Sequence, residues 1–411
     1  MGFKIGIVGT GSFARGFVPL FKNHPFTDEV VLADLIKERV EKMAEDFQIK
    51  RYVYSLDEML KTNVDAVAIF TQRHLHGEQV KRALQAGKHV YCAVPMAQTQ
   101  DEVFEILELV RRTGLIYMTG ETSYYYPSAV FCRDRFKAGA FGHFVYGEAR
   151  YFHDMSHGFY DAFRRSGGAD WKRVAGIPPM HYPTHSISLV LSVTGAKALK
   201  VSCLGYIDRH MDGIFRKGGN LWDNPFSNET ALFRTSDGGM MRINEFRRIG
   251  WSGKVGEDVS LFGTLGSFEE NALTSVWTTL DRNDIEDVTP LLTCRRDPSP
   301  AVQGEHSTIA RDFHSSVAKV HHTYRLPDSF KGLPNGHYGS HQFLVDDFMK
   351  ALATNQLPPN HAWRAAEYIL PGLVAHQSAL RDGELMSIPD VGEVPSDRTI
   401  LDPDSFIAYR F

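Results

Sequence analysis

The spacing of apolar and polar positions changes once along the chain, near residue 124. Before that point, short apolar runs alternate with segments whose apolar residues recur at helical spacing. The runs cover residues 5–8, 30–34, 66–70, 89–92 and 116–119, and helical segments cover 9–21, 38–47, 71–87 and 101–113. Strands that alternate with helices form parallel sheets covered on both faces, so residues 1–123 predict a doubly wound α/β domain.

Beyond residue 124 the pattern is typical of an α+β domain. Strand-like stretches at 142–153, 198–208, 229–246 and 256–269 are separated by turn residues, and the apolar segment 185–193 predicts a helix across that sheet. Gly- and Pro-rich stretches near 210–228 and 285–340 predict long loops, and 338–380 is helical again. We therefore expect a second domain over 124–411 with an open, mostly antiparallel sheet, whose C-terminal helices can pack back on the first domain.

Composition and charge argue against a nucleic-acid-binding protein, a membrane protein and a disulfide or zinc framework. The 411 residues suffice for two cores, and a net charge of −4 gives no general attraction to nucleic acid or anionic membranes. No apolar run is long enough to span a bilayer, and no signal-peptide pattern precedes the first strand. The four cysteines are scattered without a C-x-x-C pair, which argues against a zinc site or a disulfide framework and favours the cytoplasm.

The turn after the first strand carries a dinucleotide-binding pattern, G-x-G-x-x-A. Gly9 permits the tight turn, Gly11 lets the backbone approach a pyrophosphate, and Ala14 lets helix and strand pack closely, with Ser12 and Phe13 between them. Asp34 ends the second strand, where an acid binds the adenosine ribose and repels a 2′-phosphate, which favours NAD over NADP. The alternatives are a glycine turn in an unrelated α/β fold and an ordinary acid at a strand end.

The chain resembles the Gfo/Idh/MocA oxidoreductase family over most of its length. The resemblance is carried by this turn together with the segments 71–76 and 87–90. Thr71 and His76 match the family pattern Thr-Pro-Asn-x-x-His, which implies a place beside the nicotinamide ribose. The family's Glu-Lys-Pro is replaced by Ala93-Val94-Pro95, so its catalytic lysine is absent, although Val94 and Pro95 keep the implied cofactor contact. The aspartate of its Asp-x-x-x-His motif is replaced by His181, and His185 keeps the histidine.

Four separated motifs resemble the NAD-dependent glycosidases of this superfamily, the α-N-acetylgalactosaminidase-like branch. The motifs are Ala93-Val94-Pro95, the strand segment 147–154, Tyr182-Pro183-Thr184-His185 and the His/Gly cluster at 337–341. Ala93 stands where those enzymes have a glutamate of the sugar pocket, so the resemblance does not carry N-acetylgalactosamine over as the substrate. A second branch acts on sulfoquinovosides, and Arg164, Arg165, Lys172 and Arg173 would form an anion clamp of that kind unless they are solvated surface residues.

The resemblance implies oxidation at sugar C3, loss of the C2 proton, departure of the aglycone, addition of water and re-reduction. These steps need proton carriers that work near neutral pH. We predict His185 for the C3 hydroxyl proton and Tyr182 for the C2 proton, since residues three apart at a helix start face one side. Tyr151 and His153 share one strand face and would bind sugar or assist the leaving group, and the alternative for His153 is a strand histidine whose hydrogen bonds are satisfied within the protein.

Other residues have weaker assignments. His181, Arg164 and Tyr338 are further candidates for sugar contacts, and Tyr338 has loop packing as its alternative. His181 and His185 also have a metal-ligand spacing, but no third ligand is indicated. Glu148 is expected to pair with a neighbouring arginine, and the pattern leaves open whether Glu245, Arg247 and Arg248 reach the pocket.

Three functions remain at this level. The first is an NAD-dependent glycoside hydrolase acting on a small glycoside, without nucleic-acid or membrane partners. The second is a pyranose or polyol dehydrogenase, disfavoured because Val94 cannot transfer a proton, and the third is a non-catalytic NAD-binding sensor, disfavoured by Tyr182 and His185. An uncovered sheet face would expose apolar surface, so we also expect a homodimer or homotetramer.

Overall fold

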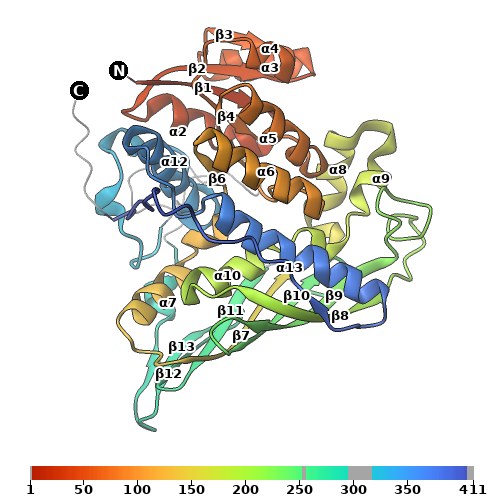
Figure 1. Ribbon diagram of the computed structural model, residues 1–411, viewed down its shortest axis with the longest axis vertical. Coiled ribbons are helices and arrows are strands. Elements are labelled where there is room, and N and C mark those ends of the chain that lie inside the picture. Colours follow the sequence, from red (N-terminus) through yellow and green to blue (C-terminus); the bar gives the residue numbers. More distant parts are fainter. Residues whose placement is uncertain (1, 252–255, 295–316, 405–411) are drawn as a thin grey trace. The chain divides into compact units, whose positions relative to one another are not determined.

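The computed structural model describes residues 2–251, 256–294 and 317–404, and the chain divides into two compact units (Figure 1). Among the described residues, the first unit takes its members from Met1–Pro127, Thr293–Ala366 and Gly392–Phe411, and the second from Ser128–Leu292 and Glu367–Val391. The boundary expected at residue 123 lies close to Pro127. Segments far along the sequence, around 317–366 and 392–404, cluster with the N-terminal unit.

A six-stranded parallel sheet forms the centre of the first unit, in the order β3-β2-β1-β4-β5-β6. The order reverses between β1 and β4, the point where doubly wound sheets bind ligands. The parallel α/β domain predicted from the sequence is thereby confirmed. The strands are β1 (Phe3–Val8), β2 (Thr27–Ala33), β3 (Arg51–Val53), β4 (Ala66–Ile69), β5 (His89–Cys92) and β6 (Tyr117–Thr119).

The helices of this unit follow local signals. Thr99 caps helix α6, since its hydroxyl oxygen accepts a hydrogen bond from Glu102 N and its hydroxyl donates to the Glu102 carboxylate. Gly114, with left-handed backbone angles, ends the helix. The helix predicted over 9–21 is interrupted near Phe17 and forms two shorter ones. The helices are α1 (Ser12–Arg15), α2 (Val18–Asn23), α3 (Lys37–Asp46), α4 (Leu56–Leu60), α5 (His76–Gln85), α6 (Gln100–Thr113) and α12 (Gly336–Thr354).

A buried ionic group attaches α12 to the rest of the first unit. Arg325 is 4% exposed, and its guanidinium donates to Asp347 at 2.7 Å and to the Tyr125 hydroxyl at 2.9 Å. The Tyr125 hydroxyl donates in turn to Asp347, and Lys350 pairs with Asp346 at 2.9 Å. A buried charge is tolerated only where such partners surround it, so these contacts fix how the helix lies.

A nine-stranded sheet dominates the second unit, in the order β14-β13-β12-β11-β7-β10-β9-β8-β15. Its pairs are antiparallel except β7 with β10, as the sequence predicted for a mostly antiparallel sheet. The strands are β7 (Phe144–Phe152), β8 (Ala198–Ile207), β9 (Phe226–Thr235), β10 (Met240–Phe246), β11 (Glu257–Gly263), β12 (Gly266–Glu270), β13 (Ser275–Thr279), β14 (Ile285–Asp287) and β15 (Met386–Ser387).

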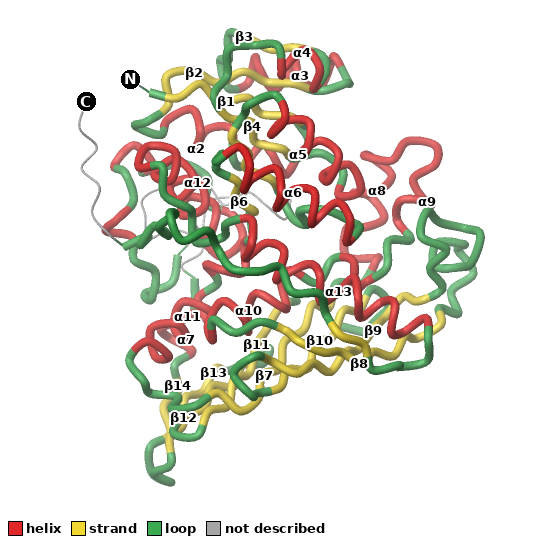
Figure 2. The backbone as a smooth tube through the Cα atoms, viewed as in Figure 1, coloured by secondary structure: helices red, strands yellow, loops and turns green. Residues whose placement is uncertain are grey.

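Helices cover one face of this sheet, here called the inner face (Figure 2). Helix α10 is buried along almost its whole length and contacts β7, β10 and β11, which confirms the helix predicted at 185–193. Its burial follows from an apolar sequence on all sides. The helices of this part of the chain are α7 (Pro127–Lys137), α8 (Tyr160–Gly167), α9 (Trp171–Ala175), α10 (Thr184–Thr194), α11 (Thr289–Leu292) and α13 (Ala362–Leu380).

The opposite, outer face carries exposed apolar side chains between polar ones. Leu204 and Tyr206 on β8, Leu232 on β9 and Met240 on β10 are each more than two-fifths exposed. They alternate along their strands with the buried residues of the inner face, as expected for a sheet covered on one side. The subunit contact expected from the sequence stays a prediction.

Several sequence expectations need correction. The single strand expected at 229–246 is a hairpin, because Asp237 and left-handed Gly238 turn the chain between β9 and β10. The stretch 256–269 likewise contains the two strands β11 and β12. Much of the loop expected at 285–340 lies outside the described residues, and its described part includes β14, α11 and the start of α12. The elements β3, α4, α7, α8, α9, β13 and β15 were not predicted.

The four cysteines differ in their environment. Cys92, Cys132 and Cys203 are buried thiols, and burial raises the pKa of each well above its ordinary value. Cys294 is partly exposed, with its sulfur 3.8 Å from the Tyr338 carbonyl oxygen. Among the helices that the structure describes, none combines the length and the apolar character that a bilayer crossing requires.

Candidate functional site

Gly9 brings the ends of β1 and β4 together. Its φ is +89°, and a Cβ atom at this position would lie 2.8 Å from the carbonyl carbon and oxygen of Phe70. Its own N–H donates to the Ala33 carbonyl at 2.8 Å. Any side chain would strain the backbone and push β4 away, so only glycine fits here.

Gly11 is required for a different reason. Its φ of −71° and ψ of 179° suit any residue, and a Cβ atom would meet nothing within 4 Å. Neither conformation nor packing therefore explains a glycine, but open space beside the backbone is what a bound diphosphate needs. Ala14 is fully buried, as expected for the small third residue, while Ser12 is exposed and Phe13 partly buried. These residues fit a dinucleotide.

Asp34 supports the same turn. One oxygen of its carboxylate accepts from Thr10 N at 2.8 Å and from the Thr10 hydroxyl at 3.0 Å, and the other accepts from Ile36 N at 2.9 Å. The carboxylate is thus oriented before any ligand arrives. Carboxylate oxygens have further lone pairs, so Asp34 can still accept ribose hydroxyls.

His76 links the Thr71 turn to the Pro95 turn. It begins α5 and is 1% exposed, with Nδ1 2.7 Å from the Pro95 carbonyl oxygen and Nε2 3.1 Å from that of Thr71. Burial lowers the pKa of His76 to about 4, so the ring is neutral at physiological pH and its single N–H donates to one of these two carbonyls while the other nitrogen lies against the second. Val94 is 7% exposed and joined to Pro95 by a cis peptide bond. His76 therefore lies in contact with both the Thr71 turn and the Pro95 turn, and Val94 contributes a buried apolar side chain to the Pro95 turn.

The His/Gly cluster packs on the glycine turn. Phe13 lies edge-on to His337 and His341, with ring centroids 5.5 and 5.6 Å away, and His337 Nδ1 is 2.9 Å from His341 Nε2. His337, Tyr338 and Gly339 all have left-handed backbone angles. Such angles are costly for residues with a Cβ, and they turn Tyr338 outward until it is 40% exposed.

The predicted proton carriers gather in the second unit. The Tyr182 hydroxyl lies 3.3 Å from His185 Nε2, and the Tyr151 ring is edge-on to His185 at 5.4 Å. His153 Nε2 lies 2.8 Å from the His157 carbonyl oxygen, which can only accept, so Nδ1 is free to accept the Tyr151 hydroxyl proton at 2.7 Å. The four side chains thus form two hydrogen-bonded pairs, Tyr182–His185 and Tyr151–His153, whose rings are in contact, and each pair can exchange a proton.

Two buried glutamates, Glu229 and Glu245, lie near these two pairs. Of the two glutamates, the sequence indicated only Glu245. It is fully buried, accepts from the Ser186 hydroxyl and pairs with Arg247 at 2.8 Å. Burial raises the pKa of Glu245 to about 7, against the opposing effects of Arg247 and Ser186. Glu229 accepts from Met180 N. A glutamate at an inward position of an alternating strand is the signal that would have revealed it.

Other predicted residues lie in different surroundings. Burial and the nearby His376 lower the pKa of His181 well below its ordinary value, which makes it a neutral neighbour of Tyr182. Arg164 is exposed, pairs with Asp161 and stacks over aromatic rings, and Lys172 donates to a backbone carbonyl, so these two residues have partners within the protein and the anion clamp stays a prediction. Within the described part of the chain, no three His, Cys, Asp or Glu residues could hold a metal ion.

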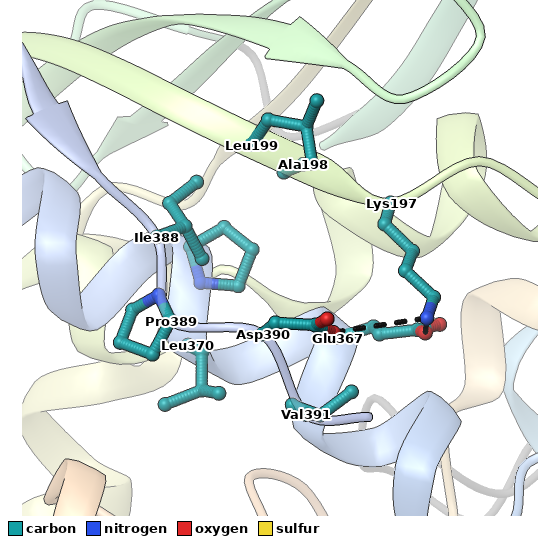
Figure 3. Close-up of a pocket in the computed structure, with 10 residues that line it drawn as sticks. Lys197, Ala198, Leu199, Glu367, Leu370, Ile388, Pro389, Asp390 and Val391 are labelled. Atoms are coloured by element: carbon teal, nitrogen blue, oxygen red, sulfur yellow. Dashed lines mark ion pairs between the residues drawn. The ribbon is translucent and has the colours of Figure 1, made fainter. Parts of the chain in front are cut away.

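A separate cavity of about 120 Å³ lies in the second unit, between the beginning of β8, helix α13 and residues 388–391 (Figure 3). Lys197 reaches Glu367 at 3.9 Å and Asp390 at 3.8 Å across it. Most of its other lining is apolar, including Leu370 and Ile388. It shares no residue with the Tyr182–His185 group.

Comparison with known proteins identifies the first domain. Residues 3–121 match the model of the Gfo/Idh/MocA oxidoreductase family, described as having an NAD-binding Rossmann fold, which confirms the predicted cofactor. A glycosyl hydrolase family 109 protein of Streptomyces niveus is 24% identical over 94% of this chain and 77% of its own. One of Shewanella amazonensis is 27% identical over 46% of this chain, and the match spans less than half, 43%, of its own length.

Solved structures share the fold. Levoglucosan dehydrogenase in complex with NADH and levoglucosan superposes with a TM-score of 0.71 at 17% identity, covering 95% of this chain and all of that one. The myo-inositol 2-dehydrogenase of Lactobacillus plantarum superposes with a TM-score of 0.67, also at 17% identity and with the same coverage. These similarities establish the two-part architecture.

The space beside Gly11 yields the first prediction. Gly11→Ala should weaken NAD⁺ binding roughly tenfold or more, because the methyl group enters the position of the diphosphate, and should change the melting temperature by less than about 2 °C. Titration calorimetry and thermal unfolding measure both quantities. Gly250→Ala is the matched control, since a Cβ there also meets nothing within 4 Å. Unchanged NAD⁺ affinity in Gly11→Ala would contradict the assignment.

The Glu245 carboxyl yields a pH prediction. Its folded-state pKa of about 7 exceeds the ordinary 4.5, so the folded protein binds this proton more tightly than the unfolded chain. Stability should therefore fall as the pH rises from about 4.5 to about 7, by at most about 3 kcal/mol from this group. Glu245→Gln has no such proton, and its unfolding free energy should fall less over that range in urea titrations. Asp258 and Glu270, with pKa values raised to about 6 and about 8, titrate in both proteins, so the difference is the measurement. Parallel curves of unfolding free energy against pH for the wild type and Glu245→Gln would refute the prediction.

Proposed function

We propose that this chain, whose residues 3–121 form an NAD-binding domain of the Gfo/Idh/MocA family, is an NAD-dependent glycoside hydrolase. One observation carries the proposal. The family's lysine position holds the buried, apolar Val94, while the second unit contains two hydrogen-bonded pairs of proton carriers, Tyr182–His185 and Tyr151–His153. Loss of one proton carrier with retention of others suits a reaction that needs several proton transfers and no net oxidation. The names of the two family 109 relatives support the same assignment.

The cofactor and the protein would divide the work. When bound, NAD⁺ supplies an acceptor for hydride from sugar C3 and a donor that returns it, so none is consumed. Gly9, Gly11 and Asp34 would hold it, through the tight turn, the open space and the oriented carboxylate. The carboxylate of Asp34 would disfavour the 2′-phosphate of NADP by charge repulsion.

The side chains of the second unit would move the protons. His185 would accept the C3 hydroxyl proton, and Tyr182, whose hydroxyl contacts His185, would accept the C2 proton made acidic by the adjacent carbonyl. Departure of the aglycone from C1 leaves a C1–C2 double bond, to which water adds. Tyr151 and His153, joined at 2.7 Å, would bind the sugar or protonate the departing oxygen.

A dehydrogenase of pyranoses or polyols is the second candidate, and His185 favours it, because this histidine also occupies the position that the family's dehydrogenases use. The two functions differ in their stoichiometry. A hydrolase releases aglycone without net NADH, whereas a dehydrogenase forms one NADH per sugar oxidised.

The decisive experiment is a panel of nitrophenyl α- and β-glycosides, including N-acetylhexosaminides and sulfoquinovosides, with and without added NAD⁺. We expect nitrophenol release that depends on NAD⁺ while NADH absorbance stays flat. Stoichiometric NADH from free sugars without nitrophenol release would overturn the hydrolase and establish the dehydrogenase. Protein stripped of cofactor by mild denaturation and refolding is the control for retained NAD.

The proton carriers give a further prediction. His185→Asn and Tyr182→Phe should each lower kcat on the best glycoside by about 10² to 10⁴, the usual contribution of general acid–base catalysis. NAD⁺ affinity should be unchanged, since neither residue belongs to the cofactor turn. Tyr206→Phe, on the outer face of the same unit, is the matched control and should retain full activity. Wild-type kcat in Tyr182→Phe would remove the tyrosine from the mechanism.

A further inference from the structure

Two glutamates oppose one another on the inner face of the nine-stranded sheet. Glu229 on β9 and Glu245 on β10 are register partners in adjacent antiparallel strands, and both are fully buried. Two carboxylates in this arrangement repel each other and lose their hydration, so each needs strong compensating contacts. Those contacts reach the segment 180–186, either directly or through neighbouring side chains.

Glu229 holds the beginning of that segment. One of its oxygens accepts from the backbone N–H of Met180 at 2.8 Å, and the other accepts from His376 Nδ1 at 2.7 Å. The His376 ring, from α13, lies edge-on to His181 with centroids 5.0 Å apart. Glu229 therefore fixes the backbone at residue 180 directly and the His181 ring through His376.

Glu245 holds the end of the segment. Its Oε1 accepts from the Ser186 hydroxyl, and its Oε2 pairs with Arg247. The Arg247 guanidinium carbon lies 4.6 Å from the centre of the Tyr151 ring, and the same side chain donates to the Tyr151 carbonyl oxygen. Glu245 thus fixes the helix start at residue 186 directly and the Tyr151 ring through Arg247.

Within the segment 180–186, Tyr182 and Pro183 lie between the short helical turn that ends at His181 and helix α10, which begins at Thr184. Tyr182 has φ −134° and ψ 50°, outside helical values, and Pro183 precedes α10 without a side-chain cap. The two predicted proton carriers, Tyr182 and His185, lie between the two anchored residues. The position of Tyr182 therefore depends on how both flanking helical segments are held, and that of His185 on how the start of α10 is held.

We infer that Glu229 and Glu245 are positioning residues, which pin Met180 and Ser186 to the sheet and so hold Tyr182 and His185 in register for proton transfer. This role rests on the proposed function, because neither buried carboxylate can touch a substrate. An apolar pair would be easier to bury, and a buried ionic pair fixes geometry at a cost in stability. The groups that face Glu245 are Arg247, Ser186, His185, Tyr151 and Glu229, from β7, β9, β10 and α10.

The test uses Glu245→Gln and Glu229→Gln in the full chain. Glutamine keeps the shape but has a single acceptor oxygen, so one of the two contacts of each carboxylate, to Ser186 or Arg247 and to Met180 or His376, is lost while the core stays filled. We expect kcat on the best glycoside to fall at least about tenfold with KM within about threefold, and the acid limb of the pH–kcat profile to move in Glu245→Gln. Glu148→Gln is the matched control, since Glu148 pairs with Arg242 on the outer face, as the sequence predicted. Equal kcat in variant and control would overturn the inference.

A substrate-independent readout separates this inference from the proposed function. In protein labelled with ¹³C at histidine Cε1, the His185 signal is assigned by its loss in His185→Asn. We expect Glu245→Gln to move that signal, because the contacts that hold Ser186, the neighbour of His185, are altered, while exposed His143 is unaffected. An unmoved His185 signal would overturn the inference. A moved signal in a protein without glycosidase activity would support the positioning role and reject only the function.

Discussion

In both units, charged groups buried among the described residues are held by hydrogen bonds and opposite charges that leave them little freedom to move. Desolvation of a carboxylate or guanidinium costs several kcal/mol unless hydrogen bonds and opposite charges replace the lost water. In the first unit Arg325, Asp347 and Tyr125 meet this requirement and fix α12. In the second, Glu229 and Glu245 meet it and fix the segment that carries the proton carriers. Geometry that matters for function is thus set by groups that are expensive to misplace.

Backbone constraints complement these charges in the cofactor turn. Gly9 allows an approach between β1 and β4 that no other residue permits, and His76 spans the turns at Thr71 and Pro95 with its two ring nitrogens. Gly11 leaves space open instead of filling it. Gly9 packs closely against Phe70, and Gly11, two residues later, borders open space. The turn is therefore rigid on the side of the sheet and accessible on the side where the cofactor would bind.

The sequence predicted the periodic parts of the fold well, since apolar runs near β1, β4 and α10 carry their own burial pattern. It merged β9 with β10 because the turn at Asp237–Gly238 interrupts the apolar pattern for only a few residues. Motif resemblance indicated Tyr182 and His185, but Glu229 and His376 lie 147 positions apart and meet only through tertiary packing. Pairings of that kind leave no local trace in a single sequence. Arg164, which the sequence placed in a loop, lies on α8 and stacks on neighbouring aromatic rings, a contact that sequence spacing does not reveal.

The unequal burial of the cysteines gives the protein a built-in chemical handle. Maleimides react with thiolates, and burial suppresses both the ionisation and the accessibility of Cys92, Cys132 and Cys203. Cys294 is partly exposed and lies against the backbone of Tyr338, two residues before the buried Ser340 of α12. A fluorophore attached to the native chain would therefore be directed to Cys294, and its emission would report on the left-handed segment that borders the cofactor turn, without any engineered label site.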